Sequence, residues 1–349
     1  MVIIVTPRLL SMTTKIVFIE RKYWSKDIKM FSIEKVFAEV SRLLPEDGFV
    51  SEFVRVPYGN SAVETIKNLI SFKKPKADIY HVTGQINYMA LVLPARRTVL
   101  TVHDLGFLNN GNGGWLRRYL IKKLFLDLPI RRLKYITAVS EATRDDIVAT
   151  ARCSPDKIRV IENPIQEDYQ ASGRGAFNKD RPTILQVGIT ENKNIPNLIE
   201  ALKGISCRLK IIGELSGDLV RALTEARIDY ESAVALDNEG MKAAYEEADI
   251  VAFCSTFEGF GLPIIEAQAM RTPVITSNLS PMIEVSGGAA YLADPHDAAS
   301  IREGILKIIS DDEFRESITR QGLENVKRFQ PAAISKQYQD LYMEMLEGK

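Results

Sequence analysis

The chain has 349 residues, a length typical of two domains at roughly 150 residues each. Hydrophobic residues make up 46% and charged residues 26%, as in ordinary globular proteins, which argues against disorder and leaves apolar material for two cores. Lys+Arg and Asp+Glu both number 45, and this balance argues against a nucleic-acid binder with a global basic field. The 3 cysteines fit neither a disulfide framework nor a Cys-x-x-Cys metal site, so a reducing, cytoplasmic location is expected.

Charged residues interrupt every hydrophobic run before it reaches the length of a membrane-spanning helix. We therefore expect a soluble or peripheral protein. Residues 1–11 are interpreted as a short lead-in or as an overcalled start, in which case Met12 is the initiator.

Runs of β-branched residues alternate with helical periodicity along the whole chain. In the first half we expect strands at 15–20, 77–82, 97–104 and 135–140, and helices at 32–44, at 85–93, from Trp115 and from Ser140. A Pro- and Gly-punctuated linker follows at 163–182. In the second half we expect strands at 182–188, 208–213, 248–255 and 273–277, and helices at 194–204, 217–226 and 263–271.

This alternation predicts an α/β protein with two doubly wound halves. The expected domains are 1–165 and 166–330, and a C-terminal helix at 331–349 is expected to return to the first domain. Open parallel sheets bind ligands beyond the carboxyl ends of their strands. Residues that follow strand ends are therefore the first candidates for a functional site.

The segment 255–266, STFEGFGLPIIE, is the richest of these strand ends. A buried strand is expected to end at Ser255 and a helix to begin at Leu262 or Pro263, where proline suits the first turn. Gly259 and Gly261 let the backbone approach a ligand, and the amides of a helix start suit a phosphate. An ordinary strand-to-helix turn is the alternative for the glycines alone.

Two carboxylates, Glu258 and Glu266, flank this turn and are expected to point into the same cleft. With them, the segment 253–297 resembles the signature of the retaining glycosyltransferases that include glycogen and sucrose synthases and bacterial lipopolysaccharide sugar transferases (glycosyltransferase group 1, family four). The two glutamates match the family's Glu-x7-Glu motif. The segments at 101–107, 136–143, 158–165 and 184–202 resemble the family in the expected order.

The resemblance implies a GT-B fold, in which two Rossmann-like doubly wound domains face each other across a cleft. It also implies that Glu266 binds the ribose hydroxyls of a sugar nucleotide and that Glu258 contacts the donor sugar. The amides around Gly261 would hold the diphosphate together with Lys193. The complete donor site implied in this way comprises Gly188, Lys193, Ser255, Gly259, Phe260, Gly261, Leu262 and Glu266.

His103 resembles the family histidine that contacts the donor sugar near the reacting centre, so His103 and Glu258 are the candidate catalytic residues. The imidazole and a neighbouring backbone carbonyl are alternative groups for stabilising positive charge on the sugar. Asp104 is expected to orient His103 or the acceptor.

The chain departs from the family pattern at two places. Ile189 stands where many members carry an arginine after the glycine, and the loop ERKYWSKDIKM lacks the glycines that usually follow the first strand. Tyr23, Trp24 and Ser25 would then form the acceptor-side wall. The cations available to replace the missing arginine are Arg21, Lys22 and Lys26.

Residues 115–134 form a basic amphipathic stretch with a single acid, Asp127. Its basic residues are Arg117, Arg118, Lys122, Lys123, Arg131, Arg132 and Lys134. Such a stretch suits an anionic membrane surface, and the alternative is a core-facing helix with a solvated basic face. The preceding loop, 109–114, is interpreted as a flexible connection that gates the acceptor.

We therefore expect a cytoplasmic retaining glycosyltransferase, at the inner face of the membrane if 115–134 binds lipid. It would move a sugar from a nucleoside-diphosphate sugar to a carbohydrate or lipid-linked acceptor, in polysaccharide or glycolipid synthesis. No Asp-x-Asp triplet or histidine cluster points to an obligatory metal. The alternatives are a sugar-nucleotide epimerase or a phosphorylase, and a noncatalytic protein that binds a partner or a membrane.

Overall fold

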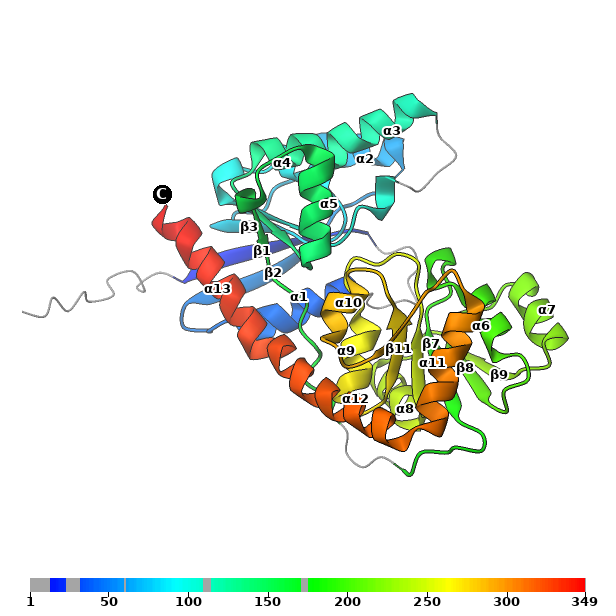
Figure 1. Cartoon of the computed structure of the whole chain (residues 1–349). Helices are drawn as coiled ribbons and strands as arrows, with labels where there is room; N and C mark the ends of the chain where they lie inside the picture. The colour runs from blue at the N-terminus through cyan, green and yellow to red at the C-terminus, as the bar shows by residue number, and fades with distance from the viewer. Residues whose placement is uncertain (1–12, 23–31, 60, 109–113, 171–174, 349) are drawn as a thin grey trace, which may run out of the picture. The chain divides into compact units, whose positions relative to one another are not determined.

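The computed structural model describes residues 13–22, 32–59, 61–108, 114–170 and 175–348 (Figure 1). The chain divides into two compact units, Met1–Pro164 with Pro331–Lys349 (unit 1) and Ile165–Gln330 (unit 2). The N-terminal start, Tyr23, Trp24, Ser25 and Lys26, and most of the loop 109–114 lie outside the described residues. Within the described ranges, no helix is long and apolar enough to cross a membrane.

Unit 1 contains one parallel sheet, with the strand order β2-β1-β3-β4-β5-β6. Its strands are β1 (Thr14–Glu20), β2 (Phe49–Arg55), β3 (Ile79–Val82), β4 (Thr98–Val102), β5 (Tyr135–Ala138) and β6 (Ile158–Val160). Its helices are α1 (Ser32–Arg42), α2 (Ala62–Ser71), α3 (Trp115–Lys122), α4 (Leu128–Arg132), α5 (Glu141–Ala151) and α13 (Pro331–Glu347). A π-helical turn, Lys123–Asp127, joins α3 to α4.

Both faces of this sheet are covered, which explains the continuous apolar runs of its inner strands. Val17 and Ile19 of β1 point into a core with Tyr88 and Leu126. Phe18 points to the other face, where its ring centre lies 6.0 Å from that of Phe37 on α1.

The C-terminal helix α13 completes the second face of unit 1 and runs beside α1 (Figure 1). Its Tyr342 hydroxyl lies 2.7 Å from Nδ1 of His81, whose Nε2 lies 2.7 Å from Oγ1 of Thr101. Burial lowers the pKa of His81 to about 3, so the imidazole stays neutral at physiological pH. Ser335 also donates to the carbonyl of Val40 on α1 at 3.0 Å.

Unit 2 contains the second parallel sheet, with the strand order β12-β11-β10-β7-β8-β9. Its strands are β7 (Thr183–Val187), β8 (Arg208–Ile212), β9 (Asp229–Ala233), β10 (Ile250–Phe253), β11 (Val274–Ser277) and β12 (Tyr291–Ala293). Its helices are α6 (Ile195–Leu202), α7 (Gly217–Glu225), α8 (Asn238–Glu247), α9 (Leu262–Ala269), α10 (Met282–Ser286), α11 (Ala298–Ser310) and α12 (Asp312–Asn325). If the strands of unit 2 are numbered along the chain with β7 as strand 1, their order in the sheet from β9 to β12 is 3-2-1-4-5-6. This is the Rossmann order.

The predicted α/β class with two doubly wound sheets is confirmed. One predicted element differs in type, because residues 85–93 contain only a short 3-10 helix, Asn87–Leu91, in place of an α-helix. Gln85 has a left-handed backbone with a φ of 53°, and Pro94 restricts the residue before it. These two constraints bound the segment, whose helical turn is of the 3-10 type.

Candidate functional site

The order of strands in unit 2 reverses between β7 and β10, which are neighbours in the sheet. Ligands of open α/β sheets bind beyond the carboxyl ends of the strands at such a switch point. Two loops leave these ends, 188–194 after β7 and 254–261 after β10. The predicted donor residues Gly188 and Lys193 and the predicted catalytic residue Glu258 all lie on these two loops.

Lys193 and Glu258 form an ion pair across the switch point. Nζ of Lys193 lies 2.6 Å from Oε1 of Glu258, and the two side chains are 16% and 15% exposed. The ammonium also lies 4.4 Å from the ring centre of Phe253, the last residue of β10. Gly188 allows this placement, because a Cβ there would come within 3.0 Å of Cε of Lys193 at a φ of +86°.

Two asparagines that sequence reasoning missed connect the loops. Nδ2 of Asn192 donates to the carbonyl of Phe257 at 2.8 Å and to Oε1 of Glu258 at 3.2 Å. Asn194, left-handed with a φ of 59°, donates to the carbonyls of Cys254 at 3.0 Å and Pro295 at 2.6 Å. Asparagine tolerates a left-handed backbone better than most residues. Its residue type is therefore the one signal in the sequence that points to Asn194.

Ile189, at the position of the missing arginine, is an apolar packing residue. It packs against the core of unit 2, and a Cβ at Gly213 would come within 2.6 Å of its Cγ2. Lys193 is therefore the basic side chain that the loop after β7 brings to the switch point.

The start of α9 presents backbone donors beside this ion pair. The helix begins at Leu262 after Gly261, which has a φ of +113°, and no side chain caps its first turn. Ser255 is fully buried, and its hydroxyl has no hydrogen-bond partner among the described residues. Its carbonyl accepts a hydrogen bond from the Ser277 hydroxyl at 2.5 Å. Uncapped first-turn amides suit an anionic oxygen.

Glu266 lies one turn into α9 and is 9% exposed. The hydroxyl of Tyr245, on α8, donates to its Oε2 at 2.5 Å. Burial and the Glu266 charge raise the pKa of Tyr245 well above its ordinary value. In the same loop as Glu258, Phe260 is buried, and its ring centre lies 5.7 Å from that of Phe329.

His103 belongs to unit 1 and follows the end of β4. Its Nε2 lies 2.9 Å from the carbonyl of Thr83, which only accepts, so Nε2 carries a hydrogen and donates. Burial lowers the pKa of His103 to about 4, so the imidazole is neutral at pH 7 and its other ring nitrogen is an acceptor. Its backbone carbonyl accepts from the Thr143 hydroxyl at 3.4 Å.

Asp104 belongs to a polar network at the carboxyl edge of the sheet in unit 1. It accepts from Nε2 of Gln85 at 2.8 Å and from the amide of Gly106 at 2.7 Å. Gln85 in turn accepts from Arg21, which donates to Glu34 at 3.0 Å. Sequence reasoning missed Gln85 and Glu34, because neither lies in a motif.

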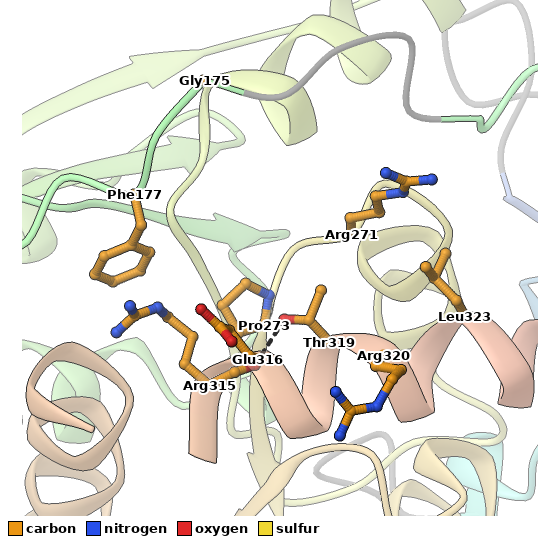
Figure 2. Close-up of a pocket in the computed structure, with 9 residues that line it drawn as sticks. All are labelled: Gly175, Phe177, Arg271, Pro273, Arg315, Glu316, Thr319, Arg320 and Leu323. Carbon is orange, nitrogen blue, oxygen red and sulfur yellow. Dashed lines mark hydrogen bonds between the residues drawn. The ribbon is translucent and has the colours of Figure 1, made fainter. Parts of the chain in front are cut away.

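A separate cavity of about 490 Å³ lies in unit 2 away from the switch point (Figure 2). Its lining includes Pro273, directly before the amino end of β11, and Phe177, whose ring lies 4.0 Å from the guanidinium carbon of Arg315. In Figure 2 the guanidinium groups of Arg271 and Arg320 point away from each other. All strands of this sheet are parallel, so the cavity lies near their amino ends, whereas Lys193 and Glu258 lie beyond their carboxyl ends.

No group of three or more His, Cys, Asp or Glu side chains that could hold a metal ion occurs within the described ranges.

The chain matches two family models, "Glycosyltransferase Family 4" over residues 39–169 and "Glycosyl transferases group 1" over residues 170–325. It is 30% identical over 270 residues to the O-antigen chain mannosyltransferase B of Escherichia coli, covering 68% of each chain. Among solved structures, it is similar to the sucrose-phosphate synthase of Thermosynechococcus elongatus, with a TM-score of 0.78 and 16% identity over 96% of this chain and 100% of that chain. It is also similar to HepE of Anabaena in complex with UDP and glucose, with a TM-score of 0.75 and 16% identity over 95% and 100%.

The family predicted from the sequence is confirmed by these matches, and the two sheets agree with the GT-B structures to which the chain is similar. The chain belongs to the group 1 glycosyltransferases of family 4.

Proposed function

We propose that this protein is a retaining glycosyltransferase that uses a nucleoside-diphosphate sugar in polysaccharide or glycolipid synthesis. The Lys193–Glu258 pair at the switch point of unit 2 carries the proposal. The similarity to an O-antigen chain mannosyltransferase supports a carbohydrate or lipid-linked acceptor, and HepE is a fold neighbour in complex with UDP and glucose.

We assign the diphosphate to Lys193 and to the first-turn amides of α9. The ribose hydroxyls are assigned to Glu266 and the donor sugar to Glu258. Negative charge grows on the diphosphate as it leaves, so a fixed ammonium stabilises the transition state more than the ground state. Glu258 holds this ammonium in place at 2.6 Å.

The reaction we propose retains the configuration of the sugar. The C1–O bond to the diphosphate breaks, and a C1–O bond to the acceptor hydroxyl forms on the same face. The hydroxyl proton passes to an oxygen of the leaving diphosphate. His103, neutral and donating through Nε2 to Thr83, is assigned a contact to the donor sugar through its other ring nitrogen.

A thermal-shift titration with UDP, GDP, ADP and their sugar conjugates tests the donor site, because a ligand that binds only the folded state raises its stability. We expect one base to stabilise the protein. Glu266→Gln should abolish that shift without unfolding the chain, whereas Glu313→Gln, an exposed control on α12, should leave it unchanged. Equal nucleotide affinity of Glu266→Gln and the parent protein would refute the assignment.

The start of the basic stretch in unit 1 supports a second proposal, contact with an anionic membrane at the cytoplasmic face. On α3, Trp115 is 79% exposed, Leu116 54% and Leu120 56%, and Arg117 and Arg118 lie among them. Exposed apolar side chains beside arginines suit a lipid surface.

The basic face is smaller than the sequence predicts. Lys122 and Lys123 both pair with the buried Asp127, at 2.6 and 2.9 Å. The exposed arginines of α3 are therefore the sharper targets for a test of membrane binding.

Flotation with phosphatidylglycerol vesicles tests this contact. Each basic residue near such a surface contributes about 1 kcal/mol, so Arg117→Glu/Arg118→Glu should weaken binding by roughly 30-fold or more. The matched control is Arg96→Glu/Arg97→Glu, an exposed pair elsewhere in unit 1. No flotation of the parent protein would end this proposal and leave the solvated-face interpretation.

A further inference from the structure

Glu266 is a nearly buried carboxylate, and a buried charge requires donors that replace water. Tyr245 supplies one. Its ring is fully buried, and its hydroxyl donates to Oε2 of Glu266 at 2.5 Å, the short distance expected for a bond to an ionised acceptor. The bond joins α8 to α9, so it is tertiary and not a local helix contact.

Tyr245 is itself held from two sides. The ring of Tyr169 packs edge-on against it, with ring centres 5.7 Å apart and an interplanar angle of 71°. Thr272, after α9, donates to the carbonyl of Tyr245 at 3.3 Å. The hydroxyl therefore has little freedom to leave Glu266. Its hydrogen bond fixes the carboxylate, although the glutamate side chain has three rotatable bonds.

We propose that Tyr245, supported by Tyr169, is a positioning residue that binds one oxygen of Glu266 and orients the other toward the ribose hydroxyls of the donor. The inference rests on the proposed donor role of Glu266. It goes beyond that role, because it assigns the orientation of the carboxylate to a residue outside the glycosyltransferase signature.

This role predicts a particular kinetic pattern. Ribose contacts are equal in the ground state and the transition state, so loss of their alignment raises KM for the donor and leaves kcat nearly unchanged. Loss of a hydrogen bond to a charged group corresponds to about a tenfold weaker donor affinity or more. A purely structural role would lower thermal stability without this split.

Tyr245→Phe removes the hydroxyl and keeps the ring that packs on Tyr169. With whichever of UDP, GDP and ADP stabilises the parent protein, we expect its Kd to rise about tenfold. The control is Tyr230→Phe, a partly buried tyrosine on the edge strand β9. It should bind the nucleotide as the parent does.

The outcomes separate the two proposals. If none of the three nucleotides binds the parent protein, the donor site itself is wrong. If Glu266→Gln loses binding while Tyr245→Phe keeps the parent Kd, the donor site stands and the positioning role is refuted. If Tyr245→Phe lowers thermal stability but leaves Kd and KM unchanged, Tyr245 is only a packing residue and the inference is likewise refuted.

Discussion

The ion pair of Lys193 and Glu258 predicts a measurable coupling between two residues that lie 65 positions apart in the chain. Lys193→Met removes the ammonium and keeps the length of the side chain, whereas Glu258→Gln removes the charge and keeps the shape. The two single variants and the double variant form a thermodynamic cycle on the ligand-free protein.

The structure sets the size of the coupling. At 2.6 Å and an effective dielectric constant of about 20, the Coulomb attraction is about 6 kcal/mol. Both groups are largely buried, so desolvation offsets most of it, and a charged hydrogen bond retains about 1.5–3 kcal/mol.

The single variants should differ. Lys193→Met leaves Glu258 with a hydrogen bond from Asn192, whereas Glu258→Gln leaves the ammonium over the ring of Phe253. We expect the loss of Lys193 to be the more destabilising, because the remaining carboxylate is then a largely buried anion without its cation.

Scanning calorimetry is the assay. One kcal/mol corresponds to roughly 2–4 °C for a unit of this size, so the double variant should melt about 3–12 °C above the additive expectation. Raising the salt concentration should change the coupling little, since buried pairs are weakly screened. If the stability losses of the two substitutions add to within about 0.5 kcal/mol, the Lys193–Glu258 contact is refuted.

Further predictions concern unit 1. The folded-state pKa of Glu20 is raised to about 7 by burial, above the ordinary 4.5, so the folded state loses stability as the pH rises from 4.5 through 7. Glu20→Gln should therefore raise the free energy of unfolding at pH 8 by up to about 3 kcal/mol and change it little at pH 4.5. Urea titrations at about pH 8 and pH 4.5 check this. The pKa of His103 is lowered to about 4, so the unfolded state gains a proton first as the pH falls below 6.5, and stability falls toward pH 4. His103→Gln should flatten that acid limb, and an unchanged slope would contradict a buried neutral imidazole. Ser61 and Glu64 form a capping box at the start of α2, so Ser61→Ala should cost about 1 kcal/mol in thermal unfolding, and a loss below about 0.3 kcal/mol would count against it.

The strands that sequence patterns identified are the interior ones. Eight strands were predicted, and they correspond to β1, β3, β4, β5, β7, β8, β10 and β11. The four missed strands, β2, β6, β9 and β12, are the edges of the two sheets. An interior strand is buried on both faces and has an apolar run of residues. The edge strand β9, DYESA, has no buried residue and carries no such pattern.

The candidate site likewise has residues that the sequence predicts and residues that it does not. Motif spacing pointed to Lys193 and Glu258, but their contact depends on β7 lying beside β10, an order that local patterns do not encode. Tyr245 lies in a helix without a distinctive motif, so its bond to Glu266 had no signal in the sequence. Residues that bind through a motif are thus predictable, and residues that support them through tertiary contacts are not.

The return of α13 to unit 1 has a consequence for synthesis on the ribosome. Unit 2 is one uninterrupted stretch of chain, so all of its strands emerge before the last helix is translated. Unit 1 begins first but finishes last, because His81 lacks its contacts with Tyr338 and Tyr342 until the last helix is released. The second half of the sequence can therefore reach its native packing before the first, which reverses the usual N-to-C order of cotranslational folding.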